Sequence, residues 1–587
     1  MVQPAFRSVA LSAKSRLLPL ALAAFLGACS TTPVAPPAAP LAQAPQAPSV
    51  AAHAMVAAAN PMAVDAGVAV LRRGGTAVDA AVAVQAVLGL VEPQSSGLGG
   101  GAFMVFYDAK TRRVTAYNGR ETAPAGASPD MFLGSDGKPL PFFTAVLSGR
   151  STGVPGAIAM LDLAQVQHGK LAWADLFGDA ERLADQGFVV PGRLAAAANS
   201  RAPEAGAPDA ARYFTKADGK RIQAGDVLKN PAYAESLRLI ASQGSAGLLQ
   251  GKLAEAIVAR THEGDLPGSL TLVDLAHYRA KADPALCRPY RVYLVCLPPA
   301  PAGGPSVLEA LGLLQRTDID QRTQIDPQGW YLFSQASRLM YADRDRYIGD
   351  PDFVSVPTDG LLSAGYLDQR AKLIGPVAGP APAPGSPPGA PVRGPDRTVE
   401  PGGTSHVVIV DAYGNVLSMT TTVESVFGSG RMVGGFFLNN QLTDFSFSPR
   451  DPDGAPAANA VAPGKRPRSA MSPTIVLDRQ GRFVAAMGSP GGPGIIAYDL
   501  KALVGVLDWK LPMQTALDLP NLIARKDTYD AEVGKFAPGV AEGLAARGVS
   551  LVTGTGAEGS GLHGVEATPQ GLSGGADSRR EGVARGF

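Results

Sequence analysis

The chain has 587 residues, of which 46% are hydrophobic, so it is long enough to bury a large core. Lysine and arginine total 52 against 51 aspartate and glutamate residues, which excludes a global charge that would attract nucleic acid or an anionic membrane. The expected partner is therefore a small molecule.

Residues 1–28 have the order of charged and apolar residues that is typical of a secretory signal. Three basic residues precede the apolar run 17–26, which is too short to span a bilayer. The run ends in Leu-Gly-Ala-Cys, which resembles a bacterial lipobox. We therefore expect residues 1–28 to be removed and Cys29 to be lipidated, giving a periplasmic protein anchored to the outer membrane. A soluble periplasmic protein cut nearby is the alternative.

The next segments predict a tether, two helices and a hairpin. Residues 29–50 are rich in proline and alanine and have no apolar face, so we expect an extended tether. Alanine and valine dominate residues 55–91 around a Gly-Gly pair, which predicts two packed helices. The glycines at 97–101 then predict a tight turn into a buried hairpin made of FMVFYD and RVTAYN.

Three segments with helical periodicity follow, at residues 155–187, 231–260 and 305–346. Cys287 and Cys296 flank a short stretch that suits a hairpin, and both a disulfide and two buried free thiols remain open. Proline and glycine dominate residues 376–403, so we expect a mobile segment there that forms no core element and is easily cut.

After residue 403 the pattern changes to strands. Residues 406–422 and 471–489 each predict a hairpin. Helical periodicity returns over residues 494–507 and again from Met513. The chain is therefore expected to be α+β, with hairpins inside and helices outside.

Several sequence blocks, in one order, resemble the gamma-glutamyltransferase (glutathione hydrolase) family. They span residues 50–587 and include GGTSHVVIVDAYGNV, LNNQLTDFS, KRPRSAMSPTIV and GSPGG. The resemblance implies an N-terminal-nucleophile hydrolase, an αββα sandwich of two stacked antiparallel sheets flanked by helices. Both fragments of a self-cleaved precursor would form this sandwich. Without the resemblance, Thr404 would be an ordinary strand residue.

The resemblance implies that the precursor cuts itself between Gly403 and Thr404. The products would be a large subunit of residues 51–403 and a small catalytic subunit of residues 404–587. A threonine hydroxyl is a weak nucleophile that needs a base, and a free α-amino group with an unperturbed pKa of about 7.7–8.0 suits this role. Only cleavage creates that amino group.

Further catalytic roles follow from the resemblance. Thr422 matches the threonine that hydrogen-bonds the nucleophile. Gly491 and Gly492 match the pair that lines the oxyanion hole, where backbone N–H groups meet the developing charge. The acyl group on the nucleophile would pass to water or to an amino acid or peptide acceptor.

The implied substrates are glutathione and related γ-glutamyl compounds, whose α-carboxylate and α-ammonium need partners once buried. Arg120 and Ser469 match residues that bind the α-carboxylate. Asp444, Gln441 and Glu424 match ligands of the α-ammonium.

Three departures from the family pattern concern the substrate. Ala470 replaces a second serine, residues 493–494 replace a serine-arginine pair, and the short loop between residues 445 and 459 has no tyrosine or tryptophan lid residue. A glutaryl or cephalosporin acylase of the same superfamily is therefore the alternative, although a glutaryl group lacks the ammonium that Asp444 would pair with. An inactive lipoprotein that only binds its ligand is the third hypothesis.

Other charged residues are expected to be structural. His406 matches a structural position of the family, and Arg466 and the charged residues 343–346 are expected to form ion pairs on a helix. No cluster of cysteine, histidine or carboxylate residues has the spacing of metal ligands, so we expect neither a metal nor another cofactor.

Overall fold

The computed structural model describes residues 49–587, except 395, 397, 401, 451–453 and 555–558. The predicted signal, the lipidation site Cys29 and most of the tether therefore lie outside the described residues. The predicted tether is two residues too long, because β1 (Ser49–Ala51) already pairs with β19 (Gly571–Ala576). No helix of the described chain is both long and apolar enough to cross a membrane.

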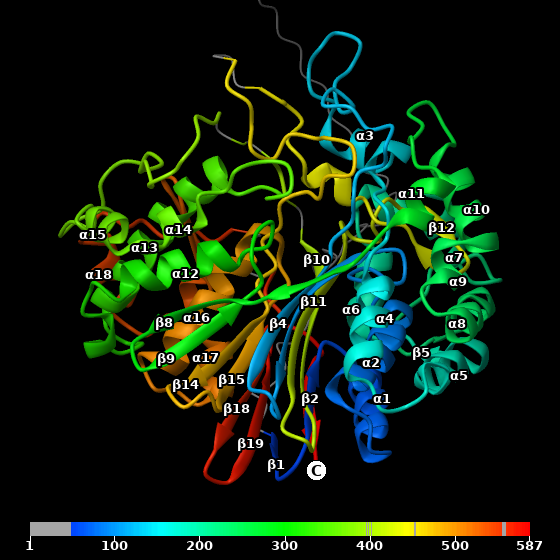
Figure 1. Ribbon diagram of the computed structural model, residues 1–587, viewed down its shortest axis with the longest axis horizontal. Coiled ribbons are helices and arrows are strands. Elements are labelled where there is room, and N and C mark those ends of the chain that lie inside the picture. Colours follow the sequence, from blue (N-terminus) through cyan, green and yellow to red (C-terminus); the bar gives the residue numbers. More distant parts are fainter. Residues whose placement is uncertain (1–48, 395, 397, 401, 451–453, 555–558) are drawn as a thin grey trace, which may run out of the picture. The chain divides into compact units, whose positions relative to one another are not determined.

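Two seven-stranded sheets lie between two layers of helices (Figure 1). The order of the first sheet is β20-β2-β10-β11-β3-β4-β7, and that of the second is β1-β19-β18-β15-β14-β9-β8. Every pairing between neighbouring strands is antiparallel. Val105 and Val408 from the first sheet pack in one core with Ile475 and Ala486 from the second. This confirms the αββα sandwich.

The strands of the first sheet are β2 (Met55–Ala58), β3 (Gly101–Asp108), β4 (Arg113–Gly119), β7 (Lys281–Pro284), β10 (Gly403–Val410), β11 (Val416–Glu424) and β20 (Val583–Gly586). Besides β1 and β19, the second sheet contains β8 (Leu286–Tyr290), β9 (Tyr293–Leu297), β14 (Thr474–Asp478), β15 (Phe483–Gly488) and β18 (His563–Thr568). Three small two-stranded sheets are β5 (Phe188–Val189) with β6 (Val227–Leu228), β12 (Met432–Val433) with β13 (Phe436–Phe437), and β16 (Leu522–Arg525) with β17 (Thr528–Ala531).

The helices that share a core with the first sheet are α1 (Pro61–Arg72), α2 (Ala77–Val91), α4 (Ala157–His168), α5 (Gly178–Gln186), α6 (Gly192–Ala198), α7 (Pro208–Tyr213), α8 (Pro231–Gln243), α9 (Ala246–Leu249), α10 (Gly251–Thr261) and α11 (Leu272–His277). Those that share a core with the second sheet are α12 (Gly304–Leu314), α13 (Pro327–Tyr347), α15 (Ala364–Ala371), α16 (Ile495–Leu507), α17 (Met513–Asp518) and α18 (Val540–Ala545). The short helices α3 (Phe142–Val146) and α14 (Thr358–Leu361) lie in smaller clusters.

The prediction of two helices over residues 55–91 is wrong at its start. Residues 55–58 form strand β2, whose four residues are all buried and pair with β10 on one side and β20 on the other. The first helix begins only after Asn60, whose side chain accepts the Met62 N–H. The second begins with a capping box between Thr76 and Asp79.

The predicted hairpins and longer helices are confirmed. The β3–β4, β10–β11 and β14–β15 pairs are the expected hairpins, and Cys287 is joined to Cys296 by a disulfide across β8 and β9. This resolves the alternative that the sequence left open.

The described residues of the segment 376–402 form no helix or strand, as expected, but the segment is held at several points. The Gly385 N–H donates to the Asp343 carboxylate, and Gly394 forms an isolated bridge with Ala457. The side chain of Glu400 is only 5% exposed. The segment therefore contacts the folded core at least at Gly385, Gly394 and Glu400.

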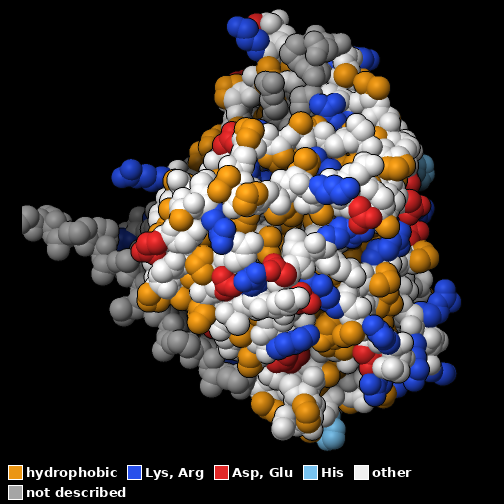
Figure 2. All heavy atoms as spheres, turned by 90° about the vertical axis from the view of Figure 1, so that its left-hand side faces the viewer, with side chains coloured by type: hydrophobic (Ala, Val, Ile, Leu, Met, Phe, Trp, Pro, Cys, Tyr) orange, Lys and Arg blue, Asp and Glu red, His pale blue; other side chains and the backbone are white. Residues whose placement is uncertain are grey.

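Asp343, Arg344 and Asp345 form ion pairs, as predicted, but only the pair of Arg344 with Asp345 lies within one helix. Asp343 pairs with Arg370 on α15, and Arg344 pairs with Glu400. On the face that carries α13 and α15, basic and acidic side chains are interspersed (Figure 2). The near-equal numbers of basic and acidic residues in the whole chain are thus also seen on this face.

Candidate active site

The predicted cleavage bond lies at an irregularity in the β10–β11 ladder. Gly403 is paired with Glu424 and Thr404 with Thr422, which leaves Val423 as an extra residue on β11. Glu424 has a φ of 82°, in the left-handed region that residues other than glycine seldom adopt. Regular strand pairing is therefore interrupted at the Gly403–Thr404 bond.

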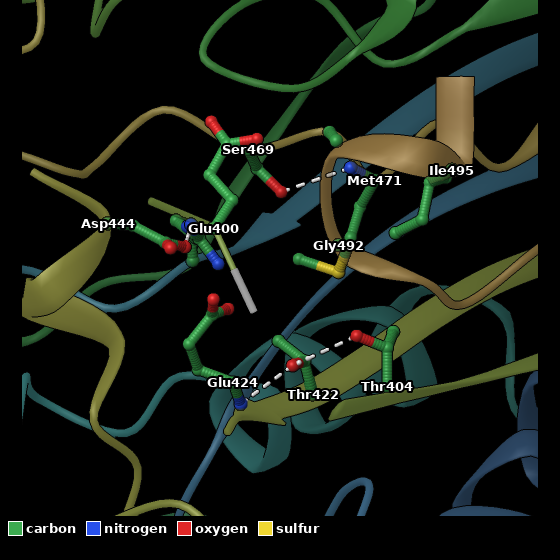
Figure 3. Close-up of a pocket in the computed structure, with 11 residues that line it drawn as sticks. Glu400, Thr404, Thr422, Glu424, Asp444, Ser469, Met471, Gly492 and Ile495 are labelled. Atoms are coloured by element: carbon green, nitrogen blue, oxygen red, sulfur yellow. Dashed lines mark hydrogen bonds and ion pairs between the residues drawn. The ribbon is translucent and has the colours of Figure 1, made fainter. Parts of the chain in front are cut away.

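Two threonine hydroxyls form a short chain of hydrogen bonds at this bond (Figure 3). The Thr404 hydroxyl donates to the Thr422 hydroxyl oxygen at 3.3 Å. The Thr422 hydroxyl donates to the Gly403 carbonyl oxygen at 2.6 Å and accepts the Glu424 N–H at 2.8 Å. Thr422 thus contacts both the predicted nucleophile and the carbonyl that it would attack.

Glycine is required beside the bond because neighbouring backbone lies very close. A Cβ added at Gly403 would lie 2.3 Å from the Glu424 carbonyl oxygen. A Cβ added at Gly100, in the predicted tight turn, would lie 2.0 Å from the Thr422 carbonyl oxygen. Any side chain at either position would push the strands apart.

The predicted oxyanion glycines lie next to the chain that leads to Thr404. A Cβ added at Gly402 would lie 3.5 Å from the Gly491 carbonyl carbon and 3.6 Å from the Gly492 nitrogen. Both Gly491 and Gly492 have positive φ angles, 130° and 56°. A short 3₁₀ turn over Gly492–Gly494 follows, and α16 begins after it.

Most of the predicted site residues line one cavity (Figure 3). These residues are Arg120, Thr404, Thr422, Glu424, Asp444, Ser469 and Gly492. Gly491 precedes the last of them. Gln441 donates from its amide nitrogen to Glu424 at 2.6 Å and to Asp444 at 2.7 Å. The structure therefore brings together residues from five separate stretches of the sequence, at 120, 404–424, 441–444, 469 and 491–492.

The cavity contains one buried guanidinium and several buried acidic groups. Arg120 pairs with Asp444 and also donates to the carbonyl oxygen of Arg468 at 2.8 Å. Three acceptor atoms, Oε1 of Glu424, Oε1 of Gln441 and Oδ1 of Asp444, have no hydrogen-bond partner among the described residues. Buried acceptors are nearly always paired, so this cluster is suited to receive donors from a ligand.

Burial changes the protonation of these acids. It raises the pKa of Glu424 well above its ordinary value, and the neighbouring Asp444 carboxylate raises it further. Burial also raises the pKa of Asp444, although Arg120 opposes this, and it raises the pKa of Glu121 to about 8. Burial thus favours the protonated form of each of these three acids.

His406 is enclosed in the first sheet. Its Nδ1 lies 2.8 Å from the Thr420 hydroxyl and its Nε2 lies 3.4 Å from the Ser418 hydroxyl. Burial lowers the pKa of His406 well below its ordinary value, so the ring is neutral. These contacts agree with the predicted structural role. Across the described ranges, no group of three or more histidine, cysteine or acidic residues could hold a metal ion.

Two features of the site were not predicted from the sequence. Arg580, which is buried, donates to the Thr404 carbonyl oxygen at 3.0 Å. Glu400 lines the cavity and is bound by Arg344 and Arg468. The sequence offered one signal for each residue. Arg580 lies in the C-terminal sequence GGADSRREGVARG, which also resembles the family. Glu400 is an acidic residue close to the predicted cleavage bond.

Two antiparallel sheets between helix layers, with a threonine hydroxyl beside the carbonyl of the preceding glycine in a central strand, define an N-terminal-nucleophile hydrolase. The chain belongs to the gamma-glutamyltranspeptidase family, because the sequence profile of that family matches residues 63–587. It is thus an enzyme of a hydrolase and transferase family.

Named relatives agree with this assignment. The chain is 36% identical over 480 residues to the glutathione hydrolase proenzyme of Bacillus subtilis (strain 168), which covers 80% of each chain. It is 34% identical over 545 residues to the glutathione hydrolase proenzyme of Escherichia coli (strain K12), covering 90% of this chain and 92% of the relative. The crystal structure of cephalosporin acylase from Bacillus halodurans matches with a TM-score of 0.82 and 26% identity, covering 94% of this chain and 99% of that one.

Proposed function

We propose that the chain is a self-processing γ-glutamyl amide hydrolase and transferase that acts on glutathione and related γ-glutamyl compounds. The observation that carries this proposal is the cluster of unpaired acceptor atoms on Glu424, Gln441 and Asp444 beside Arg120. An α-ammonium has three N–H donors for these acceptors, and Arg120 with Ser469 would bind the α-carboxylate.

The first step is cleavage of the precursor into residues 51–403 and 404–587. The Thr404 hydroxyl oxygen attacks the Gly403 carbonyl carbon, and the peptide nitrogen takes up the hydroxyl proton as it leaves. The Thr422 hydroxyl, already bonded to the Gly403 oxygen at 2.6 Å, stabilises the charge that develops there. Water then opens the ester and leaves a free α-amino group on Thr404.

The second step uses this amino group as the base. It takes the proton of the Thr404 hydroxyl, whose oxygen attacks the γ-amide carbonyl of the substrate. The N–H groups of Gly491 and Gly492 stabilise the oxyanion, and the leaving amine receives the proton. Arg580 supports this role, since a cation next to Thr404 lowers the pKa of the new amino group. Water or an acceptor amine then releases the acyl group.

The alternative, a glutaryl or cephalosporin acylase, is supported by the similarity in fold to the cephalosporin acylase of Bacillus halodurans. A glutaryl group has the carboxylate of a γ-glutamyl group but no ammonium. It would leave one oxygen each of Glu424, Gln441 and Asp444 without a donor among the described residues, which is costly in a buried site. The pocket therefore favours the γ-glutamyl substrate.

Replacing the proposed ammonium ligand separates these two functions. We expect Asp444→Asn to lower kcat/KM for γ-glutamyl p-nitroanilide about 10- to 100-fold, because the negative charge that would pair with the α-ammonium is removed. Turnover of glutaryl p-nitroanilide should change much less. Steady-state kinetics of the cleaved variant measure both values, and a wild-type enzyme that prefers the glutaryl substrate would rule out the proposed function.

The raised pKa of Glu424 predicts that substrate binding releases protons. An ammonium favours the charged carboxylate, so binding lowers the pKa of Glu424 and expels its proton. We therefore expect KM for γ-glutamyl p-nitroanilide to fall as pH rises through the raised pKa of Glu424, and this dependence to be lost in Glu424→Gln. Calorimetry in buffers of different ionisation enthalpy counts the protons; uptake on binding would contradict this assignment.

We also propose that Cys29 carries the lipid that anchors the protein to the outer membrane from the periplasm. The lipobox-like sequence before it supports this. Labelling with a radioactive fatty acid tests the proposal: the wild type should take up label and Cys29→Ala should not. Equal labelling of both would place the lipid elsewhere, and no labelling would favour a soluble periplasmic enzyme.

A further inference from the structure

A carboxylate of the chain itself occupies one side of the proposed substrate cavity. Glu400 lies near Asp444 and Ser469, across the cavity from Thr404 and Thr422 (Figure 3). Both of its carboxylate oxygens accept from Arg344 Nη2 at 2.9 Å. One of them also accepts from Arg468 Nη2 at 3.0 Å. An anion is thus already bound on the side of the cavity where Ser469 lies.

Arg344 and Arg468 form their closest ion pairs with the segment that contains Glu400. The side chains of Arg344 and Arg468 are both fully buried. Arg468 also pairs with Asp396 of the same segment at 3.1 Å, while its Nη1 has no hydrogen-bond partner among the described residues. Burial would raise the pKa of Glu400, but Arg344, Arg468 and Arg525 lower it to about 2, so the pairing is ionic.

Self-cleavage would separate Glu400 and Asp396 from the strand that follows them in the chain. Glu400 and Asp396 precede the cut at Gly403 and would then belong to a free chain end, whereas Arg344 remains on α13 and Arg468 on the folded core. If Glu400 withdraws together with Asp396, both buried guanidinium groups lose their nearest carboxylate and, among the described residues, share only Asp345, at 3.4 Å from Arg344 and 3.9 Å from Arg468. Two buried cations beside one acid are costly unless another anion takes the place of Glu400.

We propose that Arg468, assisted by Arg344, binds the α-carboxylate of the γ-glutamyl group in the cleaved enzyme, at the place that Glu400 holds before cleavage. This rests on the proposed function. Arg468 directly precedes Ser469 and Ala470, which both line the cavity, and Ala470 has no hydroxyl to donate. The Arg468 carbonyl oxygen also accepts from Arg120 at 2.8 Å, so Arg468 lies directly behind an arginine that lines the cavity.

The leaving group of a substrate can also carry a carboxylate, such as that of the glycine residue of glutathione, and this carboxylate is the other candidate for binding at Arg344 and Arg468. The position of Glu400 favours the α-carboxylate. Glu400 lies on the side of Ser469 and Asp444, away from Thr404, whereas the leaving group departs from the carbonyl carbon at Thr404 (Figure 3). Kinetics with substrates that lack one group at a time distinguish the two sources.

The test compares γ-glutamyl p-nitroanilide with 4-aminobutyryl p-nitroanilide, which lacks only the α-carboxylate. The cleaved double variant Glu400→Gln/Arg468→Met is used, because removing both partners leaves no Glu400 carboxylate without Arg468 in the precursor, while Asp396 keeps its hydrogen bond from Asn459. Its ratio of kcat/KM for the two substrates should fall about 10- to 100-fold. The cleaved Glu400→Gln variant is the matched control and should keep the wild-type ratio. Glu400→Gln/Arg344→Met provides a second route and should shift the ratio in the same direction.

Three results would overturn the proposal. An unchanged ratio in both double variants would show that these arginines do not recognise the α-carboxylate. An unchanged ratio with a loss of glutathione turnover would assign them to the leaving group. A shifted ratio in Glu400→Gln alone would show that Glu400 stays in the site after cleavage. Wild-type enzyme that does not turn over γ-glutamyl p-nitroanilide would instead contradict the proposed function.

Discussion

Thr404→Ala is expected to yield one uncut and inactive polypeptide. The variant lacks the hydroxyl that lies beside Thr422 and would attack the Gly403 carbonyl. Without cleavage no α-amino group forms, and without the hydroxyl no acyl-enzyme forms, so both steps are lost together. Denaturing gels and γ-glutamyl p-nitroanilide assays measure the two losses.

Thr404→Ser is the matched control, because it keeps the hydroxyl and removes only a methyl group. We expect it to cleave and to retain turnover at a reduced rate. If Thr404→Ala still matured into two fragments with activity, another residue would be the nucleophile. That outcome would also remove the basis for assigning the cavity to the substrate.

Thr422→Val should slow self-cleavage about 100- to 1,000-fold, which is the usual cost of losing one donor to a developing oxyanion. The substitution keeps the shape of the side chain but removes the hydroxyl that donates to Gly403 and accepts from Glu424. The buried Glu424 N–H would lose its partner, which adds a stability cost of about 1–3 kcal/mol. A time course of fragment formation by the purified precursor measures the rate.

Thr421→Val is the control for this experiment. Thr421 is the neighbouring residue on β11, and its hydroxyl contacts the Gly101 carbonyl oxygen at 3.4 Å instead of the cleavage bond. We expect its cleavage rate to stay close to that of the wild type. Equal slowing in both variants would mean that the effect comes from strand stability and not from the Thr422 hydroxyl.

Much of the fold could be predicted because alternating residues mark strands and periodic residues mark helices. The β10–β11 hairpin was predictable in this way, since its two runs flank a turn at Gly414 with a φ of 82°. Residues 55–58 were not, because four consecutive apolar residues fit a buried strand and a buried helix equally well. Their assignment depends on pairing with β10, which lies some 350 residues away in the sequence.

The candidate site was predictable only where residues fall within sequence blocks that resemble a family. This applies to Thr404 and Asp444, whose neighbours in the sequence match the family pattern. No local pattern links Arg580 to Thr404, or Arg344 to Glu400, because tertiary packing alone brings these side chains together. Charged residues in such positions are usually solvated, so the sequence favoured surface ion pairs.

Mass spectrometry of the active enzyme, purified after expression of the full chain, tests most directly whether the chain cleaves itself before Thr404. Self-cleavage predicts two fragments and a new N-terminus at Thr404, with no mass that spans the Gly403–Thr404 bond. A fully active sample that contains only the intact polypeptide across this bond would contradict it.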